Sequence, residues 1–192
     1  MDINKLLSDA QRHFLKKEYK ESIEVFSKII ESGEALEMAH LSRGAACFQL
    51  KEFKKAIVDF KRVVELNDQN SRAYYYLGMS YLMERGFKES ISALDASIKL
   101  KPDNKTAFFT RGIAHAEDGN EDEAAKNIKT ALMSSESDNQ NFADNYGMFR
   151  TQFEKAFSLM SGEKEPPTMT LTEEEKGKLM NWLAETEGSE EG

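Results

Sequence analysis

Residues 71–104 read SRAYYYLGMSYLMERGFKESISALDASIKLKPDN, and the spacing within this stretch decides the fold of the chain. Its first half places apolar and small residues at i, i+3, i+4 and i+7: Tyr74, Leu77, Gly78 and Tyr81. After a break at Arg85-Gly86, the same helical pattern returns in Phe87, Ile91, Leu94 and Ile98. Lys101-Pro102 closes the stretch, because proline cannot continue a helix. The segment therefore predicts two helices joined by a tight turn.

The same pattern recurs along the chain at a fixed interval. KEYKESI (17–23), KEFKKAI (51–57) and RGFKESI (85–91) start 34 residues apart. Four repeats follow without insertion, at 3–36, 37–70, 71–104 and 105–138. One position of the repeat holds only small residues, which let two helix backbones approach closely: Ala10, Gly44, Gly78 and Gly112. Gly86 and Gly119 are the residues that we expect in the left-handed conformation after the first helix.

This 34-residue helix-turn-helix pattern resembles the tetratricopeptide repeat (TPR) family. The third repeat carries the resemblance best, through Tyr74, Leu77-Gly78, Tyr81, Ser90, Leu94 and Pro102. Other repeats depart from the pattern, since Arg43 and Arg111 replace leucine and Asp68 and Glu136 replace proline. The resemblance covers residues 3 to about 138. It implies an all-α TPR solenoid, a right-handed superhelix of antiparallel helix pairs that acts in protein–protein interaction.

The sequence after the repeats divides into four segments. Residues 139–160 space Phe142, Tyr146, Phe149, Phe153 and Phe157 as on one helix face, which predicts a helix that caps the open end of the stack. A fifth, degenerate repeat is the alternative. Residues 161–171 form a linker, 172–186 a short amphipathic helix and 187–192 an acidic, disordered end.

Composition and charge limit the classes of function. The chain has 192 residues, a formal net charge of -8 and one cysteine, so it has no disulfide framework. Residues 163–192 hold nine acids and three bases, which leaves the body nearly neutral and argues against nucleic-acid binding. We see neither a secretory leader nor a spanning segment and therefore expect no membrane insertion and a cytoplasmic protein.

The histidines and the cysteine do not form a catalytic pattern. His13, Cys47 and His115 occupy the repeat position of Tyr81, and His40 occupies that of Tyr74. They replace packing residues, and Cys47 is best interpreted as a small buried apolar group. The sequence also shows no phosphate-binding loop, metal-ligand cluster or acid/base pair of carboxylates. We predict no enzyme, no metal and no cofactor.

By the resemblance, the concave surface is lined by the first helix of each pair. At about 100° per residue, positions 2, 5, 9 and 12 of the repeat share one face of that helix. The predicted partner-binding residues are Leu7, Gln11, Phe14, Met38, Leu41, Phe48, Arg72, Tyr75, Tyr76, Met79, Leu82, Phe109 and Ile113. An apolar, methionine-bearing groove suits an amphipathic helix or an extended apolar peptide. The alternative is that these side chains only pack between neighbouring first helices.

The family's carboxylate clamp, which captures acidic C-terminal peptides of Hsp70 and Hsp90, is not predicted. The resemblance implies Lys, Asn, Asn, Lys and Arg at five positions of three successive repeats. This chain offers there Leu7, Gln11, Ser42, Arg72 and Tyr76. Only Arg72 fits.

The segment 172–186 supplies a candidate occupant for the groove. Leu179, Met180, Trp182 and Leu183 form one apolar cluster after three glutamates, and so short a helix is not stable alone in water. We expect it to pack near Tyr75, Met79 and Phe109, unless it is a disordered acidic tail that aids solubility. The functional hypothesis is therefore a non-catalytic adaptor or scaffold with a helix-binding groove. The alternative is a TPR scaffold that assembles with itself through the groove or the tail.

Overall fold

The computed structural model describes residues 2–34 and 36–132, which form eight α-helices and, within those ranges, no strand. The helices are α1 (Ile3–Leu15), α2 (Tyr19–Glu31), α3 (Leu36–Gln49), α4 (Phe53–Leu66), α5 (Ser71–Met83), α6 (Phe87–Leu100), α7 (Lys105–Glu117) and α8 (Glu121–Leu132). The predicted capping helix, linker, amphipathic helix and acidic end lie outside the described residues.

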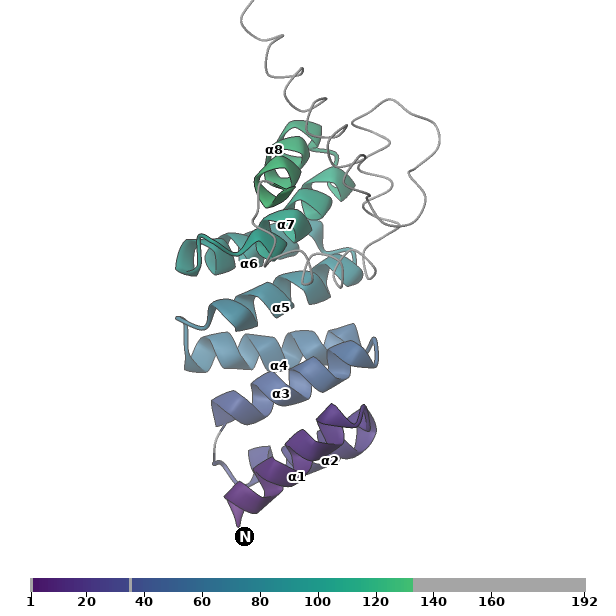
Figure 1. Cartoon of the computed structure of the whole chain (residues 1–192), viewed down its shortest axis with the longest axis vertical. Coiled ribbons are helices and arrows are strands. Elements are labelled where there is room, and N and C mark those ends of the chain that lie inside the picture. Colours follow the sequence, from purple (N-terminus) through teal and green to yellow (C-terminus); the bar gives the residue numbers. More distant parts are fainter. Residues whose placement is uncertain (1, 35, 133–192) are drawn as a thin grey trace, which may run out of the picture. The chain divides into compact units, whose positions relative to one another are not determined.

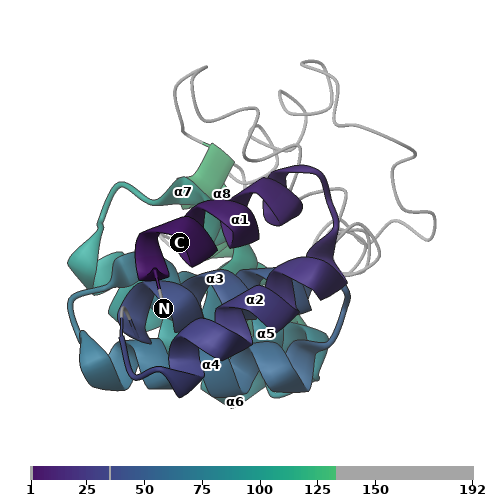
Figure 2. The same cartoon turned by 90° about the horizontal axis from the view of Figure 1, so that it is seen from below.

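The described helices pair as antiparallel hairpins in two compact units. Helices α1 to α6 lie in the first unit, and α7 and α8 lie in the second, which begins at Asp103. In the first unit, α1 to α6 are stacked in chain order, and α2 packs against α3 as α4 packs against α5 (Figure 1). Figure 2 shows α2, α4 and α6 following one another along one side of this unit. In the second unit, α7 packs against α8. The predicted all-α solenoid of helix pairs is confirmed.

The small-residue position brings the two helices of a hairpin into close contact. A Cβ added at Gly78 would lie 2.6 Å from Cγ of Leu94, and one at Gly112 would lie 2.8 Å from Cγ1 of Ile128. Neither distance is compatible with a real side chain in an unshifted hairpin. The steric role predicted for these glycines is confirmed.

The turn inside each hairpin is the same in all four repeats. Its left-handed residue, with φ between 60° and 84°, always follows the first helix by the same number of positions: Lys17, Lys51, Arg85 and Gly119. The next backbone N–H then donates to a carbonyl one turn back, as from Gly86 to Tyr81 at 2.9 Å.

The expectation that Gly86 is left-handed was wrong. Its φ is -84°, and Arg85 takes the left-handed conformation instead. The physical reason is that the hydrogen-bond pattern of the turn is common to every repeat, so the backbone position decides the conformation and the glycine beside it does not. The expectation for Gly119 is confirmed.

Candidate functional site

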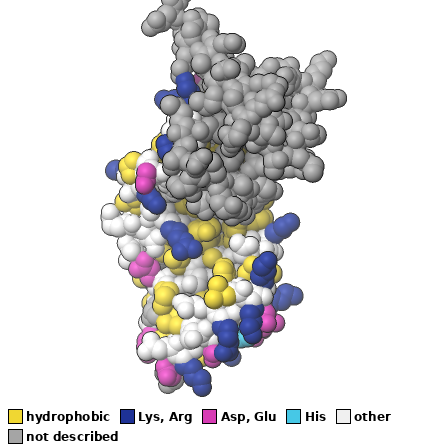
Figure 3. Space-filling model, in the orientation of Figure 1, with side chains coloured by type: hydrophobic (Ala, Val, Ile, Leu, Met, Phe, Trp, Pro, Cys, Tyr) yellow, Lys and Arg dark blue, Asp and Glu magenta, His cyan; other side chains and the backbone are white. Residues whose placement is uncertain are grey.

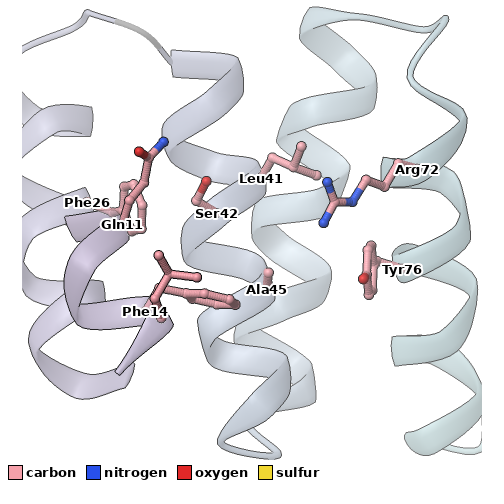
Figure 4. Close-up of a pocket in the computed structure, with 9 residues that line it drawn as sticks. Gln11, Phe14, Phe26, Leu41, Ser42, Ala45, Arg72 and Tyr76 are labelled. Atoms are coloured by element: carbon pink, nitrogen blue, oxygen red, sulfur yellow. The ribbon is translucent and has the colours of Figure 1, made fainter. Parts of the chain in front are cut away.

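The first unit has a cavity of about 250 Å³ between its first three hairpins (Figure 4). Helix α1 supplies Gln11, Phe14 and Leu15, and Phe26 comes from α2. The remaining lining residues are Leu41, Ser42 and Ala45 of α3 and Arg72 and Tyr76 of α5. Three first helices thus face one space, because the 34-residue period returns the same helix face in each repeat.

The lining is mainly apolar, and one edge of it is open to solvent. Phe26 is fully buried behind the cavity and Phe14 is half-buried, whereas Leu15 is 82% exposed. In Figure 3, seen from the same side as Figure 1, apolar side chains are exposed along the first unit with Lys and Arg side chains beside them. Leu15 thus extends the apolar lining to the solvent-exposed edge of the cavity.

Tyr76 forms a fixed aromatic wall of the cavity. Its ring stacks on Phe60 at 5.5 Å between centroids and meets the edge of Phe48 at 6.0 Å. The Arg72 guanidinium lies over the Tyr76 ring, 5.6 Å from its centroid. Arg72 is exposed, and among the described residues no carboxylate forms an ion pair with it. Of the described residues that line the cavity, it is the single charged one.

The structure brings five of the predicted groove residues together at this cavity: Gln11, Phe14, Leu41, Arg72 and Tyr76. The others lie elsewhere. Leu7 packs against the buried cluster of Ala10 and Phe26, and Met38 is 40% exposed outside the cavity. Fully or almost fully buried are Phe48, Tyr75, Met79, Leu82, Phe109 and Ile113. Their part in binding a peptide stays a prediction.

Sequence reasoning missed three lining residues, Leu15, Phe26 and Ser42, as parts of one site. Ala45 occupies position 9 of the second repeat, one of the four positions assigned to the groove face, and Ser42 occupies a position at which the clamp was sought, so the repeat register carried the signal for both. The cavity also depends on a second-helix residue, Phe26, which the choice of first-helix faces excluded. The predicted tail residues Leu179, Met180, Trp182 and Leu183 lie outside the described residues.

A second polar feature of the first unit is a buried network around Asp59 of α4. Its carboxylate is 3% exposed and accepts two hydrogen bonds from Arg43, at 2.9 and 2.8 Å, and pairs with His40 Nδ1 at 2.7 Å. Arg43 also donates to Ser27 Oγ of α2 at 3.0 Å. The hydrogen bond with Asp59 raises the pKa of Arg43. The network joins three helices, and none of its side chains is among the described residues that line the cavity. This indicates a structural role.

Cys47 lies close to this network and is buried. Burial, and after it the negative charge of Asp59, raises the pKa of the Cys47 thiol to about 11. A thiol of that pKa is almost entirely protonated at neutral pH, and the thiolate is the reactive form. Cys47 therefore fits the predicted packing role.

Residues 2–34 and 36–132 contain no group of three or more His, Cys, Asp or Glu side chains arranged to hold a metal ion. Within the same residues, no helix combines the length and apolar character needed to cross a membrane.

Comparisons with solved structures place this architecture among TPR proteins. A MamA crystal structure is 27% identical, with a TM-score of 0.66, and the match covers 72% of this chain and 76% of that one. YrrB, described as a TPR protein with an unusual peptide-binding site, is 24% identical over 66% of each chain, with a TM-score of 0.63. The first TPR module of Spaghetti (RPAP3), bound to an HSP90 peptide, is 22% identical over 59% of this chain and 90% of its own, with a TM-score of 0.57.

Sequence profiles lead to the same family. A family model described as tetratricopeptide repeat matches residues 38–70, and a second model with the same description matches residues 77–141. No curated protein sequence matches the chain. The repeat motifs, the helix pairs and the profile matches agree, and the chain belongs to the tetratricopeptide repeat family.

Proposed function

We propose that this protein is a non-catalytic interaction module whose cavity between α1, α3 and α5 binds an apolar or amphipathic helical segment of a partner protein. The observation that carries the proposal is the cavity itself. It combines a buried apolar back, an exposed apolar edge at Leu15 and one charged side chain, Arg72.

The size of the cavity favours peptide side chains over a small molecule. At about 250 Å³ it lies below the range of roughly 300–1,000 Å³ that is typical of sites for drug-sized ligands. A helix that lies across the three first helices would insert one or two side chains and cover the rest of the lining. Burial of one such leucine or aromatic side chain contributes about 1.5–3 kcal/mol before the costs of ordering.

The solved relatives support a peptide or protein as the class of ligand. YrrB is described by its peptide-binding site, and the RPAP3 module was solved with a peptide bound. Among the described residues of the cavity lining, Arg72 is the single cation, whereas the carboxylate clamp has several polar groups. We therefore propose an apolar anchor as the main determinant of binding.

Two matched surface variants test the site. Leu15 and Val58 are both exposed helix residues, 82% and 65%, but only Leu15 lines the cavity. Peptides selected from a displayed library on the full chain should bind Leu15→Glu at least about tenfold more weakly, since a charge replaces a contact worth more than 1.4 kcal/mol. Val58→Glu should bind them like the parent chain, and circular dichroism should show both variants folded.

Two outcomes would oppose the proposal. Peptides that bind Leu15→Glu and the parent equally would place the binding site elsewhere. A failure to select any peptide, together with concentration-dependent assembly in light scattering, would favour the alternative, a TPR scaffold that assembles with itself.

A further inference from the structure

We infer that the edge of the first unit that is formed by its three hairpin turns binds an acidic, extended segment of a partner protein. This edge, called the turn edge below, carries two columns of cations that recur every 34 residues: Lys17, Lys51 and Arg85, and Lys20, Lys54 and Lys88. None of the six is among the described residues that line the cavity, so the inference goes beyond the proposed function.

The cations of the turn edge are open to a ligand. All six are exposed, and the side chain of Lys54 is 87% exposed, with one carboxylate oxygen of Glu84 at 3.9 Å. Within the described part of the first unit, the other five form no ion pair, whereas Lys55 and Arg62 of α4 each bond an acid three positions away. Figure 3 shows Lys and Arg side chains on the side of the first unit where Figure 1 has the turn between α3 and α4. A row of unpaired cations attracts a ligand of opposite charge.

Backbone strain distinguishes one of the two columns. Lys17, Lys51 and Arg85 take the left-handed conformation, with φ of 62°, 60° and 61°, which is unfavourable for any residue with a Cβ. Glycine avoids this strain, and the fourth repeat has Gly119 at the position. The first three repeats thus keep a long cation where glycine would be less strained. Strain that is kept in this way points to a function of the side chain.

The turn of the fourth repeat, where glycine is used, has the opposite charge. Residues 118–123 hold four acids and no cation, whereas the equivalent residues of the first three repeats hold eight cations and five acids together. These equivalent ranges are 16–21, 50–55 and 84–89. Two of the five acids are bonded within the chain, Glu18 to His13 at 2.6 Å and Glu52 to Lys55 at 2.8 Å. Strained cations and a positive turn therefore occur together, as do glycine and a negative turn.

The spacing of the cations favours a peptide as the ligand. Because α2, α4 and α6 follow one another along one side of the unit (Figure 2), successive turns lie about one helix diameter apart, roughly 10 Å. Three residues of an extended chain span about the same distance, so an acid at every third residue would meet one turn each. A nucleic-acid strand has a phosphate about every 3.4 Å, and its additional charges would meet the acids Glu18 and Glu52 between the cations.

Fluorescence anisotropy of a labelled peptide tests the inference on the full chain. The probe repeats Glu-Ser-Gly five times, and the control peptide has glutamine in place of glutamate. The expected result is that the acidic peptide alone binds, at concentrations up to about 1 mM in about 50 mM salt, and that its binding weakens in about 200 mM salt. No binding of the acidic peptide at the lower salt concentration would overturn the inference.

Two competitors test the class of partner. A single-stranded DNA of about fifteen nucleotides and vesicles that contain phosphatidylserine should each bind more weakly than the acidic peptide, because the turn edge alternates cations with acids. Tighter binding of either competitor would overturn the inference, since the partner would then be a nucleic acid or a membrane.

Two triple variants locate the contact. Lys17→Gly/Lys51→Gly/Arg85→Gly removes one cation from each turn. Lys28→Gln/Arg62→Gln/Lys99→Gln removes three exposed cations of α2, α4 and α6 that lie away from the turns. The glycine variant should bind the acidic peptide at least about threefold more weakly, because three exposed charge pairs of small individual strength are lost. The glutamine variant should bind the acidic peptide like the parent chain.

Stability separates a loss of contact from a loss of fold. The glycine variant should melt at or above the temperature of the parent chain, because glycine relieves the left-handed strain. Weaker binding by a chain that melts no lower than the parent would support the inference. Unchanged binding by the glycine variant would overturn it, and so would equal weakening in both triple variants, since net charge alone would then explain the binding.

Discussion

The second and third repeats build the same helix pair from opposite chemistry. In the third repeat, Leu77 of α5 and Ala93 of α6 are both buried apolar residues. At the equivalent positions the second repeat has Arg43 and Asp59, which form a nearly buried ion pair that also engages His40. The 34-residue period therefore specifies which positions of the two helices face each other. It does not specify whether an apolar pair or an ion pair occupies those positions.

The fourth repeat lies between these two cases. Arg111 occupies the position of Arg43, and its Nε donates to Oδ1 of Asn127 at 2.7 Å, where the second repeat has a carboxylate. Asn127 is buried and also donates to the carbonyl of Glu123 at 2.7 Å. A polar pair is therefore used twice, once with and once without a formal negative charge.

The largest effect should come from breaking the charged pair on one side. Asp59→Ala leaves the guanidinium of Arg43 partly buried without its carboxylate, and breaking such a pair costs about 3–5 kcal/mol. Urea denaturation followed by circular dichroism measures the change in free energy of unfolding. A loss below about 1 kcal/mol would show that the pair behaves like a surface ion pair.

Transferring the residues of the third repeat sharpens the comparison. The double variant Arg43→Leu/Asp59→Ala removes both charges, so we expect it to recover most of the stability lost in Asp59→Ala. With Arg43→Leu as the fourth corner of a double-mutant cycle, the coupling energy should exceed about 1.5 kcal/mol. Additive effects of the two single changes would contradict a specific pair.

Replacing the glycine of the small-residue position by alanine should cost less stability than breaking the ion pair, and the cost should differ between the second and third repeats. In Gly78→Ala the new methyl group would meet Cγ of Leu94 at 2.6 Å, and the backbone carbonyl of Ser90 at 3.2 Å limits the room to move. We expect a net loss of about 1–2 kcal/mol, because overpacking outweighs the better helix propensity of alanine. In Gly44→Ala the nearest atom is Cε1 of the Phe60 ring at 2.9 Å, and the loss should be smaller. Thermal denaturation of both variants gives the order, and the reverse order would contradict the packing described here.

The smallest expected change concerns the turn. Lys51 has φ of 60° and is exposed, so Lys51→Gly should stabilise the chain by about 0.5–1 kcal/mol by removing strain. Gly119→Ala places a side chain in the same conformation, φ 84°, and should destabilise by about 1 kcal/mol. Melting temperatures that move in the same direction for both variants would contradict the shared left-handed position.

The sequence alone predicted the helix pairs, because Tyr74, Leu77 and Tyr81 repeat a period that only a helix satisfies. It also identified Arg43 and Arg111 as departures, but not their partners, since Asp59 and Asn127 are sixteen residues away on another helix. The left-handed turn was assigned to Gly86 by residue type, although the backbone position decides it.

Most of the described residues of the candidate site could be predicted from their positions in the 34-residue repeat. Gln11, Leu41 and Arg72 share a helix face, so their convergence could be predicted from geometry. Which apolar residues of that face are buried, as Met79 and Phe48 are, depends on how neighbouring helices pack. The contribution of Phe26 from α2 depends on the same packing, which periodicity does not contain.

The most direct test of the binding site is a ¹⁵N NMR titration of the full chain with one selected peptide. We predict that the largest shift changes fall on the backbone amides of residues 11–15 of α1, 41–45 of α3 and 72–76 of α5. Shift changes confined to the exposed face of α4 around Val58 would contradict a binding site between the first helices.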